Sequence, residues 1–205
     1  MTLTTERAMF AKRSQRFVRW TQRILTLTGV LALAYVAVTL FTARLFQNTA
    51  SHILEEQIHA EELHPFVGTR NPVKEGSVLG RIEIPRLALS VVVLQGTTSQ
   101  TLRLGAGHID GTALPGESGN IGIAGHRDTF FRGLKDIRSD DEILLQTAAG
   151  TAIYVVDWIQ ITQPSDGAIV FPASTSALTL VTCYPFYYIG AAPERFVVHA
   201  HSKQP

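Results

Sequence analysis

The 205-residue sequence contains a single cysteine, Cys183, so no disulfide can form within the chain. Lysine and arginine (18 residues) nearly balance aspartate and glutamate (17 residues), and the formal net charge is +1. Proteins that bind nucleic acid through its phosphates carry a clustered basic surplus, so this balance argues against that class of partner. The length suits one globular domain with a short additional segment and is too small for two full domains.

Charged residues make up only 17% of the chain, and the run Ile24–Ala43 contains none. Roughly 20 residues at ~1.5 Å each cover the ~30 Å hydrocarbon core of a bilayer, so this run predicts one transmembrane helix. Two alternatives remain open. A core helix would rarely be apolar on every side, and a cleaved signal peptide usually has a shorter apolar stretch.

Basic residues are concentrated ahead of the apolar run, in residues 1–23. The positive-inside rule predicts that this segment stays in the cytoplasm, which puts the chain from Arg44 onward outside. We therefore expect a protein of the cytoplasmic (inner) membrane that crosses it once, with an extracytoplasmic C-terminal domain. The basic residues are Arg7, Lys12, Arg13, Arg16, Arg19 and Arg23, and the one acidic residue among them is Glu6.

Residues 44–76 predict a stalk and linker. Up to residue 64 the stretch is polar with scattered aliphatic residues, as in a helical stalk, and prolines and glycines then interrupt residues 65–76. From residue 77 to 202 alternating or short apolar runs are separated by turn residues, which indicates an all-β domain with at most short helices. Its seven or eight strands predict a small closed barrel or a sandwich. The predicted strands include 78–84, 89–94, 120–125, 142–146, 151–161, 178–182 and 195–201, and residues 98–105 predict a short helix.

Two reactive residues follow predicted strands: His126 comes after 120–125, and Cys183 after 178–182. Strand ends hold side chains on a rigid scaffold that is open to substrate. An imidazole beside a thiol can hold its proton and stabilise the nucleophilic thiolate, and Arg195 is the candidate for stabilising an oxyanion. A lone cysteine after an apolar strand is more often a small buried residue, and it could also pair with another chain. The residues alone leave the role of Cys183 open.

The sequence around these residues resembles a known family. Residues 179–183 read TLVTC and resemble the TLxTC signature of sortases, the membrane-anchored cysteine transpeptidases of bacterial surfaces. Residues 125–127 (GHR) resemble the histidine segment of that family, and residues 193–198 (PERFVV) its arginine strand. The resemblance spans about residues 77–202. The segments GTALPG, GIAGHRDTFF and TLVTCYPF are most similar to class D sortases.

The resemblance implies an all-β, eight-stranded closed barrel in which Cys183, His126 and Arg195 meet at one rim. It implies that Cys183 attacks an LPxTG-like sorting signal on a surface protein and holds the acyl group as a thioester. An amine from a peptidoglycan cross-bridge or a protein lysine then resolves the thioester. In this scheme His126 transfers the protons and Arg195 stabilises substrate and oxyanion, without any cofactor.

Four further residues are expected to contact the substrate, either because they flank the cysteine or because they could reach the same rim. Two other functions stay open for the same scaffold: an endopeptidase in which water resolves the thioester, and a non-catalytic barrel that binds peptide. The four residues are Thr182, His108, Tyr184 and Pro185.

A metal site is not expected. His199 and His201 lie two positions apart on a predicted strand and therefore share a face. Two imidazoles supply half of a zinc site, and the sequence shows no carboxylate or thiolate ligand beside them.

Overall fold

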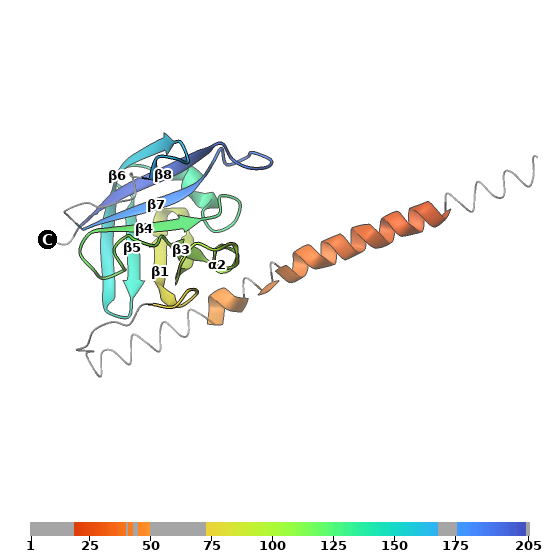
Figure 1. The fold of residues 1–205 in the computed structure, drawn as a ribbon, viewed down its shortest axis with the longest axis horizontal. Coiled ribbons are helices and arrows are strands. Elements are labelled where there is room, and N and C mark those ends of the chain that lie inside the picture. Colours follow the sequence, from red (N-terminus) through yellow and green to blue (C-terminus); the bar gives the residue numbers. More distant parts are fainter. Residues whose placement is uncertain (1–18, 40, 43–44, 50–72, 168–175, 204–205) are drawn as a thin grey trace, which may run out of the picture. The chain divides into compact units, whose positions relative to one another are not determined.

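A computed structural model describes residues 19–39, 41–42, 45–49, 73–167 and 176–203. The chain divides into two compact units, Met1–Arg44 and Leu45–Pro205. The first contains an apolar helix and the second a β-barrel (Figure 1).

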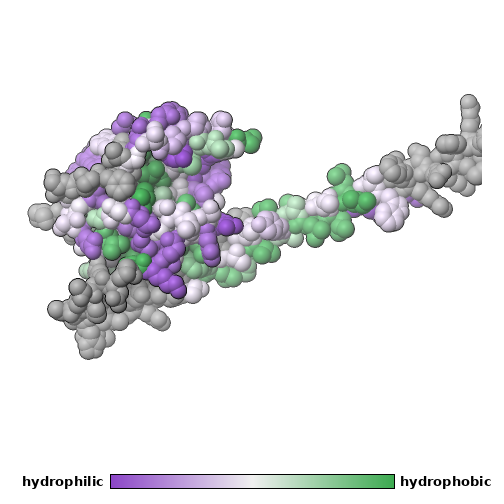
Figure 2. Space-filling model, viewed as in Figure 1, coloured by the Kyte–Doolittle hydropathy of each residue, from purple (hydrophilic) through white to green (hydrophobic). Residues whose placement is uncertain are grey.

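The apolar helix is described over Arg19–Thr39 and is long and apolar enough to cross a membrane. Its aliphatic side chains are exposed on all sides, and they form the green stretch of helix in Figure 2. The threonine hydroxyls inside it, such as those of Thr26 and Thr39, donate to backbone carbonyls in the preceding turn. Such bonds give these hydroxyls a partner in an apolar surrounding.

The expected membrane segment Ile24–Ala43 overlaps this helix, although Leu40 and Ala43 lie outside the described residues. Most of the expected stalk and linker, residues 50–72, also lies outside them.

The second unit is a closed eight-stranded barrel with the strand order β1-β2-β3-β4-β7-β8-β6-β5. Two pairs of neighbours, β2–β3 and β4–β7, are parallel, and the other pairs are antiparallel. Parallel neighbours need crossover connections: α2 joins β2 to β3, and the 3-10 helix η2, β5 and β6 lie between β4 and β7 in the chain. The elements are β1 (Val78–Ile84), η1 (Pro85–Leu87), β2 (Leu89–Gln95), α2 (Ser99–Leu104), β3 (Ala106–His108), β4 (Asn120–Gly125), η2 (Arg132–Asp136), β5 (Glu142–Thr147), β6 (Gly150–Thr162), β7 (Ala177–Tyr184) and β8 (Glu194–Ser202).

The expected all-β barrel and most of its strands are confirmed. The predicted helix is α2, whose N-cap Thr98 accepts a hydrogen bond from the Thr101 backbone N–H. Strand β3 was not expected, because three residues with a central glycine carry no readable alternation. Cys183 is also part of β7 rather than following it.

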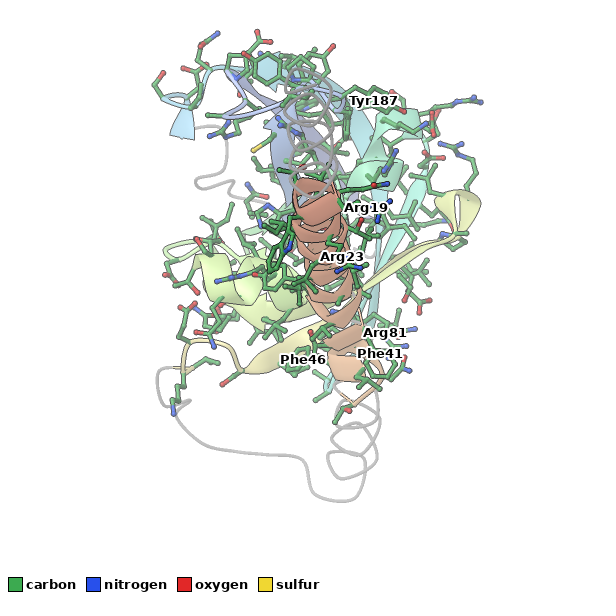
Figure 3. All side chains as sticks on the ribbon, turned by 90° about the vertical axis from the view of Figure 1, so that its right-hand side faces the viewer. Arg19, Arg23, Phe41, Phe46, Arg81 and Tyr187 are labelled. Carbon is green, nitrogen blue, oxygen red and sulfur yellow. The ribbon has the colours of Figure 1, made fainter. Side chains whose placement is uncertain are left out.

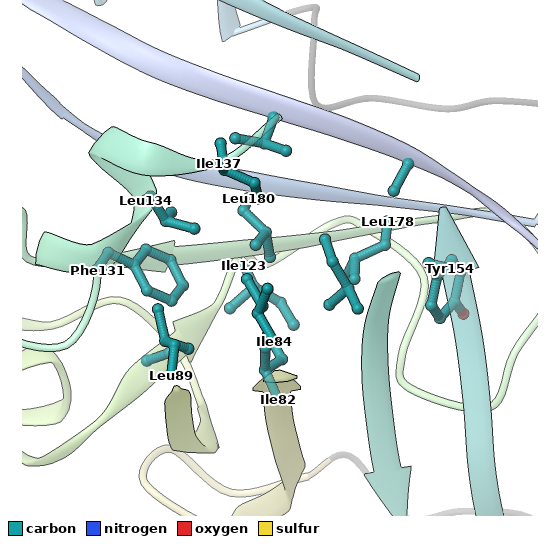
Figure 4. Close-up of a cluster of buried hydrophobic side chains, with 14 of the residues drawn as sticks. Ile82, Ile84, Leu89, Ile123, Phe131, Leu134, Ile137, Tyr154, Leu178 and Leu180 are labelled. Atoms are coloured by element: carbon teal, nitrogen blue, oxygen red, sulfur yellow. The ribbon is translucent and has the colours of Figure 1, made fainter. Parts of the chain in front are cut away.

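The barrel interior is filled by alternate residues of each strand. On β7 the even-numbered residues Leu178 and Leu180 point inward, and on β1 Ile82 and Ile84 do the same (Figure 4). Phe131 and Leu134, from the segment around η2, close one region of this core and are fully buried. Burying each such side chain contributes about 1.5–3 kcal/mol, so the core, with no disulfide, supplies the stability of the barrel.

A short helical segment, residues 45–49, docks on the outside of the barrel. Phe46 packs against Val92 and Leu94 of β2. The Gln47 side chain accepts a hydrogen bond from the Val92 backbone N–H at 2.9 Å and donates one to the Leu104 carbonyl. Because β3 begins opposite Val93, the Val92 N–H has no strand partner on that side, and Gln47 takes its place.

We predict that Gln47→Ala lowers the free energy of unfolding by about 2 kcal/mol, because a backbone donor and an acceptor lose their partner. Urea unfolding of residues 45–205 measures this. Asn48→Ala is the matched control, since Asn48 is exposed and should change stability by less than about 0.5 kcal/mol. Equal midpoints for the two variants would show that the docking contributes nothing.

Candidate active site on the outer face of β4, β7 and β8

The strand register brings the three predicted catalytic residues to the same level of the barrel. Cys183 on β7 is directly paired with Arg195 on β8. On the other side of β7, Thr182 is paired with Gly125, the last residue of β4, so His126 comes next to Cys183 one residue further on. Neighbouring strands lie about 4.8 Å apart, which puts the three backbones within two strand spacings of one another.

The alternation of side chains directs Cys183 and Arg195 to the outside of the barrel. On β7 even-numbered residues fill the core and on β8 Phe196, Val198 and Ala200 do so, and the odd-numbered partners therefore face outward. Residues paired across antiparallel strands have Cβ atoms about 4.5–5.5 Å apart, close enough for both side chains to contact one bound group.

All three side chains are half-buried, so each is held by its neighbours and still open to a substrate. The thiol of Cys183 is free. The Arg195 guanidinium donates through Nη1 to the carbonyls of Glu194 (3.0 Å) and Ala192 (3.4 Å). An arginine has five N–H donors, so this anchoring leaves others for a bound ligand.

Thr182, by contrast, points into the barrel and is only 2% exposed. Its hydroxyl donates to the Gly125 carbonyl at 2.7 Å. The expectation that Thr182 contacts substrate therefore has no support in the geometry. The hydroxyl instead joins β7 to β4 immediately before Cys183 and His126.

The turn after β4 depends on a glycine. A Cβ atom on Gly125 would lie 2.6 Å from Cδ2 of the buried Phe131 ring. The Phe131 backbone N–H donates to the His126 carbonyl at 3.0 Å, so the same phenylalanine also closes the turn that carries the histidine. Gly125, which has no side chain, therefore allows the buried Phe131 ring to pack directly against the backbone just before His126.

His108 occupies a different place from the one expected. It is 2% exposed, lies on β3 and pairs with Ile123, three positions before the level of His126 and so about 10 Å along the sheet. Its Nε2 lies 2.9 Å from the Ala113 carbonyl, and its Nδ1 lies 3.1 Å from Oε1 of Gln95. These contacts hold the loop after β3, and the structure gives no sign of a substrate contact.

Tyr184 and Pro185 lie at the end of β7, joined by a cis peptide bond. The Tyr184 ring stacks on Phe196 with centroids 6.3 Å apart, and Phe186 meets Phe196 at 5.1 Å. This aromatic group closes the barrel end beside the site. Both residues are half-buried, and their contact with substrate stays a prediction.

Asp157, which the sequence did not single out, lies beside both outward-facing histidines of β8. One carboxylate oxygen is 3.0 Å from Nδ1 of His199, and the other is 2.5 Å from Nδ1 of His201. The expectation that no carboxylate lies near this pair is therefore wrong. A bulge in β6 between Val156 and Trp158 causes the approach, and sequence alternation does not reveal bulges.

The three side chains of this cluster contact one another through a shared carboxylate. Within the described part of the chain, no group of three histidine, cysteine or acidic residues is arranged to hold a metal ion. His199 also stacks on Trp158, with ring centroids 4.9 Å apart. The cluster lies four residues, about 13 Å, along β8 from Arg195.

A closed barrel with a free cysteine on its outer face, an arginine on one adjacent strand and a histidine directly after the other defines a class of barrel-fold cysteine enzymes. The family model described as the Sortase domain matches residues 82–203. The chain belongs to the sortase family, and it is a cysteine transpeptidase of the kind that anchors surface proteins.

Individual relatives agree with this assignment. Sortase D of Bacillus subtilis is 29% identical over 164 residues, which cover 74% of this chain and 83% of that protein. The Sortase D5 transpeptidase of Clostridium perfringens has a TM-score of 0.65 at 26% identity, covering 77% of this chain and 98% of that one. A Clostridium perfringens sortase C with the C-terminal cell wall sorting motif has a TM-score of 0.60 at 25% identity, covering 74% and 88%. The resemblance to sortases, class D included, is confirmed.

We predict that Gly125→Ala destabilises the barrel by about 1–3 kcal/mol and displaces His126, because the added methyl group overlaps the buried Phe131 ring. Thermal unfolding measures the first effect and peptide turnover the second. Gly167→Ala is the control, since a Cβ there meets nothing within 4 Å. If Gly125→Ala behaves like the control, the close approach is not a constraint.

Proposed function

We propose that Cys183 is the nucleophile of this transpeptidase, His126 its general acid and base, and Arg195 the donor that stabilises the oxyanion. The observation that carries the proposal is the register: Cys183 lies on the middle strand, paired with Arg195 and adjacent to the level of His126. A thiolate needs a neighbouring proton acceptor, and an oxyanion needs a fixed donor.

In the first half-reaction, His126 holds the proton of the Cys183 thiol, and the thiolate attacks the carbonyl carbon of the scissile amide. Arg195 donates a hydrogen bond to the oxygen as it becomes negative. When the C–N bond breaks, His126 gives its proton to the leaving amine, and the acyl group remains on sulfur as a thioester. The proton that leaves the Cys183 thiol ends on the leaving amine, so the step neither gains nor loses a proton.

In the second half-reaction, an incoming amine attacks the thioester and His126 takes its proton. The new amide leaves and the Cys183 thiolate returns, so the enzyme is regenerated without any cofactor. Splitting one amide exchange into two acyl transfers is what a covalent intermediate achieves.

The substrate we propose is a surface protein with an LPxTG-like C-terminal sorting signal, and the acceptor is an amine of a peptidoglycan cross-bridge or a protein lysine. The relative solved with its C-terminal cell wall sorting motif supports this substrate class. The outer face of β7 and β8 also supports it, because an extended peptide can lie there across Cys183 and Arg195.

The soluble domain, incubated with an LPxTG-type peptide and an amine, should form the amine-linked product through a thioester detectable by mass spectrometry. Cys183→Ala should give no turnover. His126→Ala should lose about 10²–10⁴-fold in kcat/KM, and Arg195→Ala about 10²–10³-fold. His201→Ala, an outward-facing histidine of the same sheet, is the control and should retain full activity.

Two outcomes would contradict this assignment. Product formation that ignores the amine would favour an endopeptidase that uses water. Full binding of the peptide with no thioester, in wild type and Cys183→Ala alike, would favour a non-catalytic barrel.

We further propose that the apolar helix anchors the protein in the cytoplasmic membrane, with residues 1–23 inside, residues 44–76 as stalk and linker, and the catalytic domain 77–202 outside. The length of the helix and the basic residues that precede and begin it support this orientation.

A membrane-impermeant maleimide should label Cys183, the only cysteine, in intact cells without an outer membrane. In a Cys183→Ala background, Ser14→Cys should react only after the cells are permeabilised. The reverse pattern would overturn the orientation.

A further inference from the structure

Arg127 follows the proposed acid-base residue His126 and reaches a distant part of the chain. Its Nη2 donates to the carbonyl of Tyr188 at 2.7 Å and to that of Gly190 at 3.0 Å. Its guanidinium carbon also lies 5.9 Å from the centre of the Tyr188 ring. These contacts join the turn after β4 to the β7–β8 loop, which we define as residues 185–193.

Residues 187–189, in the middle of this loop, are exposed, whereas Phe186 near its start packs against Phe196. The side chains of Tyr187 and Ile189 are 73% and 98% exposed, and Tyr188 is 47% exposed. Figure 3 shows Tyr187 at the edge of the barrel, and a green patch in Figure 2 lies where this loop projects in Figure 1. These three side chains therefore add little to the buried core, so polar contacts are the means of ordering this part of the loop.

One further contact reaches the loop from η2. The Asp136 carboxylate, 2.9 Å from Nζ, raises the pKa of Lys135, and a weaker contribution comes from the Tyr187 hydroxyl. Lys135 and Asp136 are both largely exposed, so solvent screens this contact. Arg127 makes two hydrogen bonds to backbone carbonyls of the loop, both through Nη2.

The position of the loop matters because of what it connects. It begins two residues after Cys183 and ends two residues before Arg195, and Arg127 is bonded to the backbone of His126. The two Arg127 hydrogen bonds therefore connect the turn that carries His126 to the loop that lies between Cys183 and Arg195.

We propose that Arg127 is a positioning residue that holds the β7–β8 loop against the His126 turn and so shapes the surface beside Cys183 on which the substrate binds. The proposal rests on the proposed function of that surface. It assigns Arg127 no contact with the reacting atoms. Because residues 187–189 bury little apolar surface, releasing this part of the loop should weaken substrate binding and leave the stability of the barrel almost unchanged.

The test compares Arg127→Lys and Arg127→Ala with Arg132→Lys and Arg132→Ala in the full chain in detergent. Arg132 is an exposed arginine five positions along the same segment, so it controls for the loss of charge. Lysine keeps the charge but replaces the planar guanidinium, which lies over the Tyr188 ring, by a point charge on a flexible side chain. The readouts are chymotrypsin cleavage after Tyr187 or Tyr188, KM and kcat for the peptide, and the unfolding temperature.

For both Arg127 variants we expect loop cleavage and KM to rise about 10-fold, with kcat changed less than about 3-fold and the unfolding temperature within about 2 °C of wild type. The Arg132 variants should match wild type in every readout. Cleavage and KM unchanged in Arg127→Lys and Arg127→Ala would overturn the proposal. A lower unfolding temperature with unchanged KM would also overturn it, since Arg127 would then be a structural tie.

The two proposals fail separately. If wild-type protein forms neither thioester nor amide product, the proposed function of the surface beside Cys183 fails. Chymotrypsin cleavage needs no turnover, so it still decides whether Arg127 holds the loop.

Discussion

The parallel pairing of β4 with β7 is the constraint on which the site depends. It aligns Gly125 with Thr182, and the buried Thr182 hydroxyl reinforces the alignment by donating to the Gly125 carbonyl. No hairpin can join parallel neighbours, so this pairing forms only after the intervening η2, β5 and β6 have been accommodated. A slip of one residue would turn Cys183 into the barrel and Thr182 out of it. The histidine and the cysteine are therefore adjacent only when the whole barrel has closed correctly.

The same alternation separates packing from chemistry. Along β7, residues 178, 180 and 182 build the interior, while residue 183 faces outward beside Arg195. The inward-facing positions of β7 can therefore hold aliphatic and threonine side chains for packing. The outward-facing position can hold a thiol without any effect on that packing. Gly125 is the point where the two requirements meet, because the core ring of Phe131 presses on the backbone that leads into His126. A larger residue there would affect packing and chemistry together.

Most strands and the three residues at the site could be predicted from the sequence, since alternation and the TLVTC, GHR and PERFVV segments are local features. Other features of the structure are not encoded in local sequence. Thr182 and His108 stand near site motifs, but the face of a strand and its neighbours in the barrel decide that both are buried. Asp157 reaches two histidines through a bulge. Arg127 donates to backbone carbonyls 61 and 63 residues away. Every residue has a backbone carbonyl, so the sequence does not indicate which ones Arg127 contacts.

The single cysteine links stability to function. A domain with the extracytoplasmic location that we propose would ordinarily gain stability from disulfides. A second cysteine near Cys183 could capture the thiol by disulfide formation and remove the proposed nucleophile. The barrel instead closes on itself without free edges between its strands, and a continuous core from β1, β4, β7 and β8 holds it. Exposed residues such as 187–189 lie outside this core, so polar contacts rather than packing must order them. A barrel that its core stabilises without disulfides is therefore compatible with a free thiol on its outer face.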